Sequence, residues 1–184
     1  MSDIDSATTN LLKYIAASPS PFHCVEESAR QLLAGGFTEI DESAEPGVVQ
    51  PGQAAFIRRS GSILAYRAGA VSPTAAGFRI LGAHTDSPNL RIKPRPDVQR
   101  VGYRQWGVER YGGVLLTTWM DRDLGVSGRV YVRGPDGKPE ARLFRCDRPI
   151  ARSPNLAIHL NREVGTTGLL LDKQEHLPPM VGLE

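Results

Sequence analysis

Apolar side chains recur at helical spacing over the first part of the chain. Between about residues 6 and 17 they fall on one stripe, which predicts an amphipathic helix. The stripe consists of Leu11, Leu12, Ile15 and Ala16. Pro19 and Pro21 forbid continuation of this helix. A second helix is expected to begin near Pro21, because proline suits a first helical turn, and to end at Gly35-Gly36.

Shorter apolar runs then predict strands. Residues 37–40 are expected to form a short strand, and residues 54–59 and 62–67 a hairpin around the tight turn Ser60-Gly61. Residues 78–84 form the most apolar run in the chain. Near-continuous hydrophobicity is typical of a strand that is covered on both faces, so this run predicts the interior of an α/β sheet.

The character of the sequence changes after Pro88. Pro94 and Pro96 are expected to break up the segment that follows. Three further apolar runs are interpreted as strands, at residues 114–119, 128–133 and 141–146. This second part therefore looks all-β, and we place a domain boundary near residues 90–95.

Composition narrows the functional classes without selecting one. A chain of 184 residues can build one hydrophobic core, or two small ones, and its 40% hydrophobic and 23% charged residues are ordinary for a globular protein. The net charge of +2 favours a solvated rim over a nucleic-acid groove for the basic residues between 91 and 100. Cys24 and Cys146 lie far apart and in no CxxC motif, which excludes a thiolate zinc finger and does not suggest a disulfide scaffold.

Targeting signals are not recognisable in the sequence. The first five residues are acidic and do not resemble a signal peptide, and no run approaches the ~20 apolar residues that cross a bilayer. We therefore expect a cytoplasmic protein that has neither nucleic acid nor a membrane as its partner.

His84 and Asp86 are the first candidates for chemistry. They follow the predicted buried strand, and their two-residue spacing puts both side chains on one face of an extended segment. A histidine at the carboxyl end of an α/β strand is well placed for a site, and a carboxylate that orients a zinc-binding histidine is a common arrangement. These residues alone favour the alternative of a structural histidine beside an N-capping aspartate or serine.

Four blocks of this sequence resemble the aspartyl aminopeptidase family, in the same order along the chain. Residues 82–88 (GAHTDSP) are similar to the signature around that family's first metal ligand, and residues 12–27 to its first two helices. Residues 119–130, which include Trp119-Met120-Asp121-Arg122-Asp123-Leu124, and residues 155–162 (NLAIHLNR) resemble two later blocks. The likeness covers nearly the whole chain.

The resemblance implies a fold, an activity and an assembly. Residues 1–91 would be the N-terminal part of an α/β metallopeptidase catalytic domain, and residues 92–184 an inserted, incomplete, β-rich domain used for oligomerisation. Family members remove N-terminal residues from peptides with metal-activated water, prefer acidic residues in the best-known branch, and form homo-oligomeric dodecamers. The expected cofactor is Zn²⁺, two per complete active site, with Co²⁺ or Mn²⁺ as alternatives.

The resemblance also assigns roles to single residues. His84 would be a zinc ligand, and Asp86 would be the catalytic carboxylate that tunes it. His159 matches a histidine that either binds metal or reaches a neighbouring subunit's active site to contact substrate; a purely structural histidine is the alternative. For Asp121 and Asp123 we favour a turn or assembly role over zinc binding.

The family's remaining ligands and its glutamate general base have no counterpart in these residues. This chain by itself is therefore expected to be inactive. Two other functions stay open: a non-catalytic assembly module that docks onto full-length subunits, and a metal- or peptide-binding protein in which His84 and His159 meet within one chain.

Overall fold

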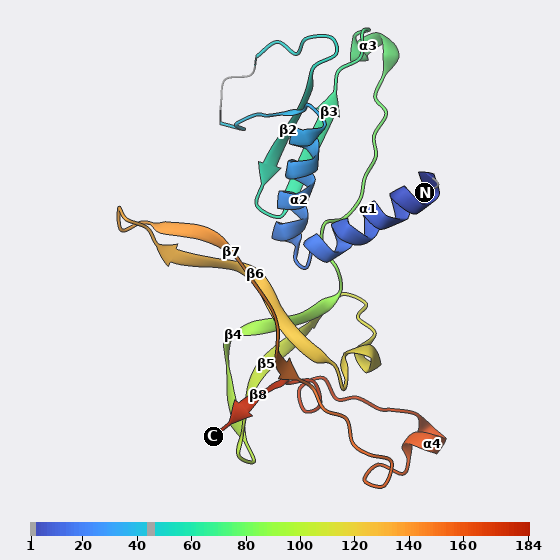
Figure 1. The fold of residues 1–184 in the computed structure, drawn as a ribbon, viewed down its shortest axis with the longest axis vertical. Coiled ribbons are helices and arrows are strands. Elements are labelled where there is room, and N and C mark those ends of the chain that lie inside the picture. Colours follow the sequence, from blue (N-terminus) through green and yellow to red (C-terminus); the bar gives the residue numbers. More distant parts are fainter. Residues whose placement is uncertain (1–2, 44–46) are drawn as a thin grey trace. The chain divides into compact units, whose positions relative to one another are not determined.

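The computed structural model describes residues 3–43 and 47–184, so Met1 and Ser2 of the acidic N-terminus lie outside the described residues. The chain forms two compact units. The first contains Met1–Ser87 and Ser127–Phe144, and the second contains Pro88–Val126 and Arg145–Glu184 (Figure 1). Our boundary between residues 91 and 92 concerns the domains of a complete protein and stays a prediction.

Two helices open the first unit, as the apolar spacing predicted. Helix α1 spans Asp3–Ala17 and helix α2 spans Pro21–Ala34. Ser20 is the N-cap of α2, and its Oγ accepts a hydrogen bond from the backbone N–H of His23 at 3.4 Å. Capping by Ser20 and the fixed φ of Pro21 explain why α2 begins where it does.

A three-stranded sheet follows the helices. Strands β1 (Thr38–Glu39), β2 (Ala54–Arg59) and β3 (Ser62–Arg67) lie in that order, with β1 parallel and β3 antiparallel to β2. This confirms the predicted hairpin and shortens the first strand to two residues. Phe56 is fully buried, and Cys24, Val25 and Ala29 are buried on α2, which contacts the sheet. Removal of this apolar surface from water holds the layer together.

Residues 78–84 are not a strand, which corrects our prediction. They follow the short helix α3 (Pro73–Ala76) as extended chain, and their side chains are exposed; Leu81 is 101% accessible. A strand needs a neighbour whose N–H and C=O groups complete the ladder. No strand of residues 3–43 or 47–184 pairs with this run, so its apolar composition has nothing to pack against.

Glu26 and Glu27 of α2 each form an ion pair with an arginine side chain, and they do not act together as a pair of carboxylates. Glu26 contacts Arg58 at 2.7 Å, and Glu27 accepts hydrogen bonds from Arg30 and Gln31. These two donors, Arg30 before Gln31, lower the pKa of Glu27 from its usual 4.5 to about 2.

Glu27→Gln is therefore expected to destabilise α2 in a pH-dependent way. Because the pKa is lower in the folded chain, the carboxylate stabilises the helix above pH 4.5, and this stabilisation is lost as the pH falls from 4.5 towards 2. At pH 7 the expected cost is about 1 kcal/mol, since Arg30 is largely exposed. Amide hydrogen exchange in α2, compared between the two proteins at each pH, measures it. A difference that stays constant down to pH 2 contradicts this account.

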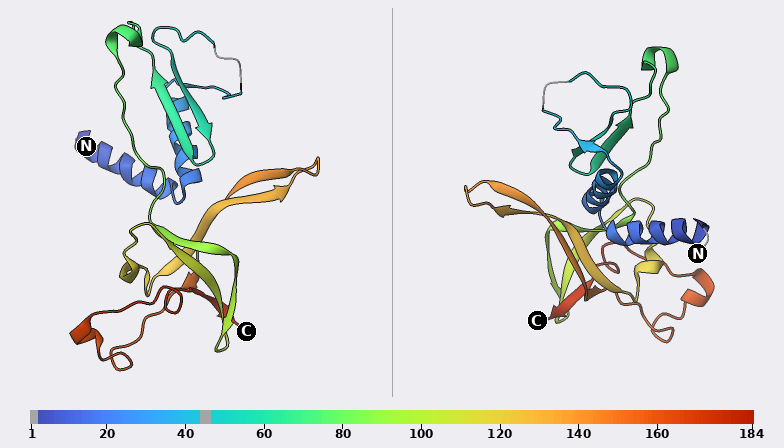
Figure 2. Two further views of the ribbon diagram at one scale, coloured as in Figure 1. Left: turned by 180° about the vertical axis from the view of Figure 1, so that it is seen from behind. Right: turned by 45° about the horizontal axis from the view of Figure 1, so that its top comes forward.

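The second unit is built on a five-stranded sheet (Figure 2). Its strands are β4 (Asn89–Arg100), β5 (Tyr103–Tyr111), β6 (Asp123–Arg133), β7 (Pro139–Arg152) and β8 (Met180–Leu183), in the order β4-β5-β8-β7-β6. Residues 127–144, the outer part of the β6–β7 hairpin, belong to the first unit. The predicted strands 128–133 and 141–146 are confirmed as parts of β6 and β7.

Two expectations for this sheet were wrong. Pro94 and Pro96 do not break up their segment, because β4 is an edge strand and its register shifts between Ile92 and Asp97, where prolines are tolerated. Residues 114–119 form no strand; Leu116–Trp119 is a 3-10 helix, η1. Thr118 explains the turn, since both its N–H and its Oγ1 donate to the carbonyl of Leu115.

A small hydrophobic core lies in the second unit. Val108, Met120 and Leu177 are buried in it, and Leu90, Leu116 and Leu171 pack around them. Ser153 is also fully buried, and its Oγ donates to the carbonyl oxygen of Leu177 at 2.8 Å. In the part of the chain that the structure describes, no helix is both long and apolar enough to cross a membrane.

Candidate functional site

The imidazole of His84 is held by the backbone of Asp86, two residues later in the chain. Its Nδ1 lies 2.7 Å from the carbonyl oxygen of Asp86 and 3.3 Å from the Oδ1 of the same residue. The segment is tied to the β2–β3 turn by Thr85, whose Oγ1 donates to the carbonyl of Gly61 at 2.6 Å. Asp86 thus orients the imidazole through both its carbonyl and its carboxylate.

This arrangement fits one zinc ligand. A carbonyl oxygen can only accept a hydrogen bond, so Nδ1 is the donor, and in the neutral imidazole Nε2 then keeps its lone pair. Metal-binding histidines commonly donate their other ring N–H to a carbonyl or carboxylate in this way. The His84 side chain is 80% exposed, which leaves Nε2 accessible to a metal.

The described residues do not supply a complete metal centre. In residues 3–43 and 47–184, no three His, Cys, Asp or Glu side chains come together in an arrangement that could hold a metal ion. Zinc in a catalytic site takes three protein ligands. His84 and Asp86 can therefore supply only part of the ligands of a metal site.

His159 lies on a long loop of the second unit, between β7 and β8. Residues 157–161 form a turn, in which the N–H of Leu160 donates to the carbonyl of Ala157 at 2.9 Å, and His159 is exposed within it. The hydrogen bond between the buried Ser153 and Leu177 closes the base of this loop. His159 is thus presented on a loop whose two ends are joined.

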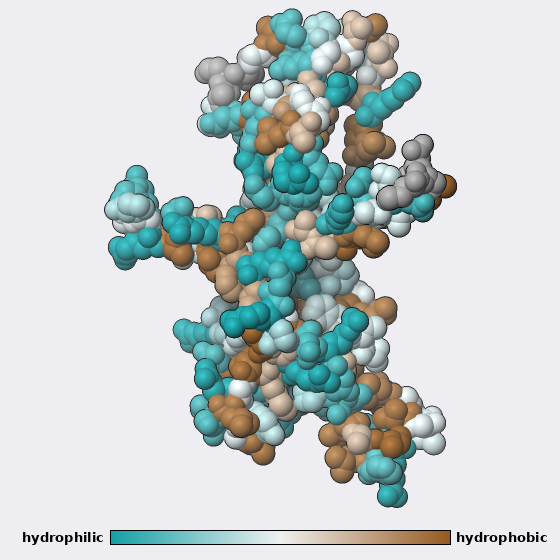
Figure 3. Space-filling model, in the orientation of Figure 1, coloured by the Kyte–Doolittle hydropathy of each residue, from teal (hydrophilic) through white to brown (hydrophobic). Residues whose placement is uncertain are grey.

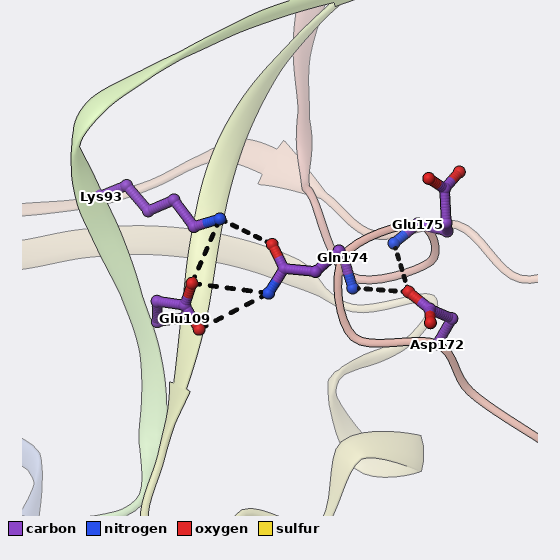
Figure 4. Close-up of polar contacts among 5 residues, drawn as sticks. All are labelled: Lys93, Glu109, Asp172, Gln174 and Glu175. Carbon is purple, nitrogen blue, oxygen red and sulfur yellow. Dashed lines mark hydrogen bonds and ion pairs between the residues drawn. The ribbon is translucent and has the colours of Figure 1, made fainter.

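A polar network fixes the returning end of the same loop (Figure 4). Gln174 accepts a hydrogen bond from Lys93 of β4 at 2.6 Å, and its amide lies 3.5 Å from both carboxylate oxygens of Glu109 of β5. The backbone N–H groups of Glu175 and Gln174 donate to Asp172 and lower the pKa of its carboxyl. The sequence did not indicate this network, because Lys93 and Glu109 lie far from Gln174 along the chain.

The loop exposes apolar side chains around His159. Four of its aliphatic residues are more than half exposed: Leu156, Ile158, Leu160 and Leu170. Figure 3 shows hydrophobic surface over the part of the loop that carries helix α4 (Val164–Thr167). An apolar surface on a loop with a fixed base is typical of a contact with another protein surface.

Asp121, Asp123 and the two remaining histidines have structural partners. Asp121 and Asp123 both pair with Arg152, at 3.7 and 3.2 Å; Asp121 lies in a turn, whereas Asp123 is the first residue of β6. His23 contacts its N-cap Ser20 through Nδ1 at 2.7 Å, and His176 accepts the N–H of Asp172.

Comparisons with known proteins agree on one family. A family model described as Aminopeptidase I zinc metalloprotease (M18) matches residues 14–184. A curated relative from Streptomyces avermitilis, named "Probable M18 family aminopeptidase 2", is 48% identical over 176 residues. That match covers 96% of this chain and 39% of the relative. The chain therefore spans less than half the length of this relative.

Solved structures show the same partial coverage. A chain from the cryo-EM structure of the Ape4 and Nbr1 complex is 37% identical and has a TM-score of 0.91, over 98% of this chain and 34% of its own length. Chaetomium thermophilum mApe1 is 33% identical, with a TM-score of 0.81, over 96% of this chain and 40% of its own length. These matches confirm the predicted α/β fold class, as one part of a larger aminopeptidase fold.

Proposed function

The chain belongs to the M18 family of zinc aminopeptidases, and from that premise we propose that the complete protein removes N-terminal residues, preferentially acidic ones, from peptides. The observation that carries the proposal is the orientation of His84, whose Nδ1 is engaged by Asp86 while Nε2 stays available. The preference for acidic residues rests on the sequence resemblance alone. The natural setting is a homo-oligomer, a dodecamer by the same resemblance, in the cytoplasm.

In this proposal His84 is a zinc ligand through Nε2, and Asp86 holds the ring and raises its basicity. Bound zinc supplies a Lewis acid that lowers the pKa of water and polarises the scissile carbonyl. His159 contacts the substrate in a neighbouring subunit, with zinc binding as the alternative role. The complete site takes two Zn²⁺, with Co²⁺ or Mn²⁺ as alternatives, and the remaining ligands and the general base come from beyond these 184 residues.

The domain assignment belongs to the same proposal. Residues 1–91 form the first part of the catalytic domain, and residues 92–184 form part of the inserted assembly domain. The exposed apolar run at residues 78–84 supports this division, since a strand of the remaining catalytic domain would pair with it and cover it.

A second candidate is a non-catalytic assembly module that docks onto full-length subunits. The apolar side chains exposed around His159 favour it. In that case the 184-residue chain alone is inactive and contributes His159 to a neighbour's site.

The intact mass and the zinc content of the natural gene product test the two candidates. For an aminopeptidase we expect a mass well above that of 184 residues and about two zinc ions per chain. The same preparation should hydrolyse substrates with N-terminal aspartate or glutamate faster than those with leucine. A product of 184 residues that binds no zinc would reject the aminopeptidase and favour the assembly module.

A further inference from the structure

Asp121 has a backbone conformation that few residues other than glycine, asparagine and aspartate adopt. Its φ is +56°, in the left-handed region, and it lies two residues before the start of β6. In this conformation its N–H donates to the carbonyl of Ser153 at 2.9 Å, and the preceding Met120 forms a parallel bridge with Ser153. The strained residue is thus fastened to the point where the His159 loop leaves β7.

The Asp121 carboxylate reaches into the loop itself. Its Oδ1 accepts the backbone N–H of Asn155 at 3.1 Å and lies 3.7 Å from the Nη2 of Arg152. Asn155 in turn accepts the N–H of Leu156 through its side-chain oxygen at 2.9 Å. Asp121 therefore fixes the backbone N–H of Asn155, four residues before His159, and the Asn155 side chain fixes the next N–H, that of Leu156.

We propose that Asp121 is a positioning residue for His159: it sets the direction in which the loop leaves the sheet, and so where the imidazole stands. This inference rests on the proposed role of His159 in the reaction. The turn at residues 157–161 is local, so it carries the direction given at Asn155 on to His159. Because Ser153 fixes the base of the loop and Asp121 fixes its first residues, the loop is preorganised for the proposed contact of His159 with substrate.

The expected size of the effect follows from one backbone hydrogen bond to a charged acceptor on an exposed surface. Loss of this hydrogen bond would reduce the fraction of molecules in which the loop holds His159 in its productive position. Turnover would fall with that fraction, by about 3- to 10-fold. Asparagine at position 121 keeps an acceptor oxygen and tolerates a positive φ, whereas glycine keeps the φ and removes the acceptor.

The test uses these two substitutions in the complete protein. We expect Asp121→Gly to lower kcat by about 3- to 10-fold and Asp121→Asn to stay within about 2-fold of wild type. Zinc content and oligomer mass should not change. Asp123→Ala is the matched control, because Asp123 pairs with Arg152 at 3.2 Å and contributes no described hydrogen bond to the loop backbone. It should leave kcat unchanged.

A double-mutant cycle with His159→Ala shows whether Asp121 acts through His159. If it does, Asp121→Gly causes no further loss in the His159→Ala background. A full additional loss there, or equal defects in Asp121→Asn and Asp121→Gly, or no defect in Asp121→Gly, would overturn the inference.

Hydrogen exchange separates this inference from the proposed function. The amides of Asn155 and Leu156 should exchange faster in Asp121→Gly than in wild type, whatever the activity. Faster exchange with no kinetic effect of His159→Ala would refute the catalytic role of His159 while the control of the loop by Asp121 stands. Unchanged exchange would refute the control by Asp121, even if His159 proves essential.

Discussion

Replacing His84 by alanine in the complete protein should abolish peptide hydrolysis and remove about one zinc ion per chain. The imidazole is already oriented by Asp86, so its Nε2 is the only ring nitrogen left for a metal. Loss of a partner that merely orients a ligand costs about 10- to 100-fold, so loss of the ligand itself should cost more than about 100-fold. Steady-state kinetics and metal analysis of the same purified protein measure both effects.

Two further variants control this result. Asp86→Asn retains the backbone carbonyl that accepts from Nδ1, so it should weaken activity by about 10- to 100-fold without emptying the site. His23→Ala removes a histidine whose ring contacts Ser20 at the start of α2, and it should keep both zinc and turnover. Full zinc occupancy and near-normal activity in His84→Ala would rule out His84 as a ligand.

The second large effect is expected for His159→Ala, which should lower kcat by about 100- to 1,000-fold, in the range for the loss of one group that contacts the reacting centre. Zinc content should stay at the wild-type level, because in this proposal the imidazole contacts substrate and not metal. The exposed position of His159, on a loop lined with exposed aliphatic side chains, suits a contact made in another subunit. Turnover, zinc content and oligomer mass, measured on one preparation, separate the possibilities.

Each alternative role of His159 has its own outcome. Loss of zinc together with turnover would place His159 in the ligand set. Unchanged kinetics with a lower oligomer mass would leave it a part of the assembly surface alone. Turnover and oligomer mass of His159→Ala should be compared with those of Leu160→Ala, which removes an apolar side chain of the same turn and keeps the imidazole.

Local sequence determined the elements whose backbone hydrogen bonds join residues that are near one another in the chain, namely a helix and a hairpin. Helix α2 begins at Ser20-Pro21 and ends before Gly35, and the β2–β3 hairpin has the predicted limits. The two-residue spacing also indicated that His84 and Asp86 lie close together, although the chain bends at Thr85 and the shortest contact of the imidazole is to the backbone carbonyl of Asp86. The four motif blocks were sufficient to identify the family.

Tertiary structure decided the features that depend on distant partners. Residues 78–84 have the composition of a buried strand, yet no described strand pairs with them, and apolar character cannot replace a missing ladder. Pro94 and Pro96 lie within a strand because that strand is at the sheet edge. The hydrogen bond from Asn155 to Asp121 joins residues far apart in sequence. The sequence by itself thus determined the family and the limits of the local helices and hairpin, whereas the direction of the His159 loop follows from long-range hydrogen bonds, which side-chain periodicity does not encode.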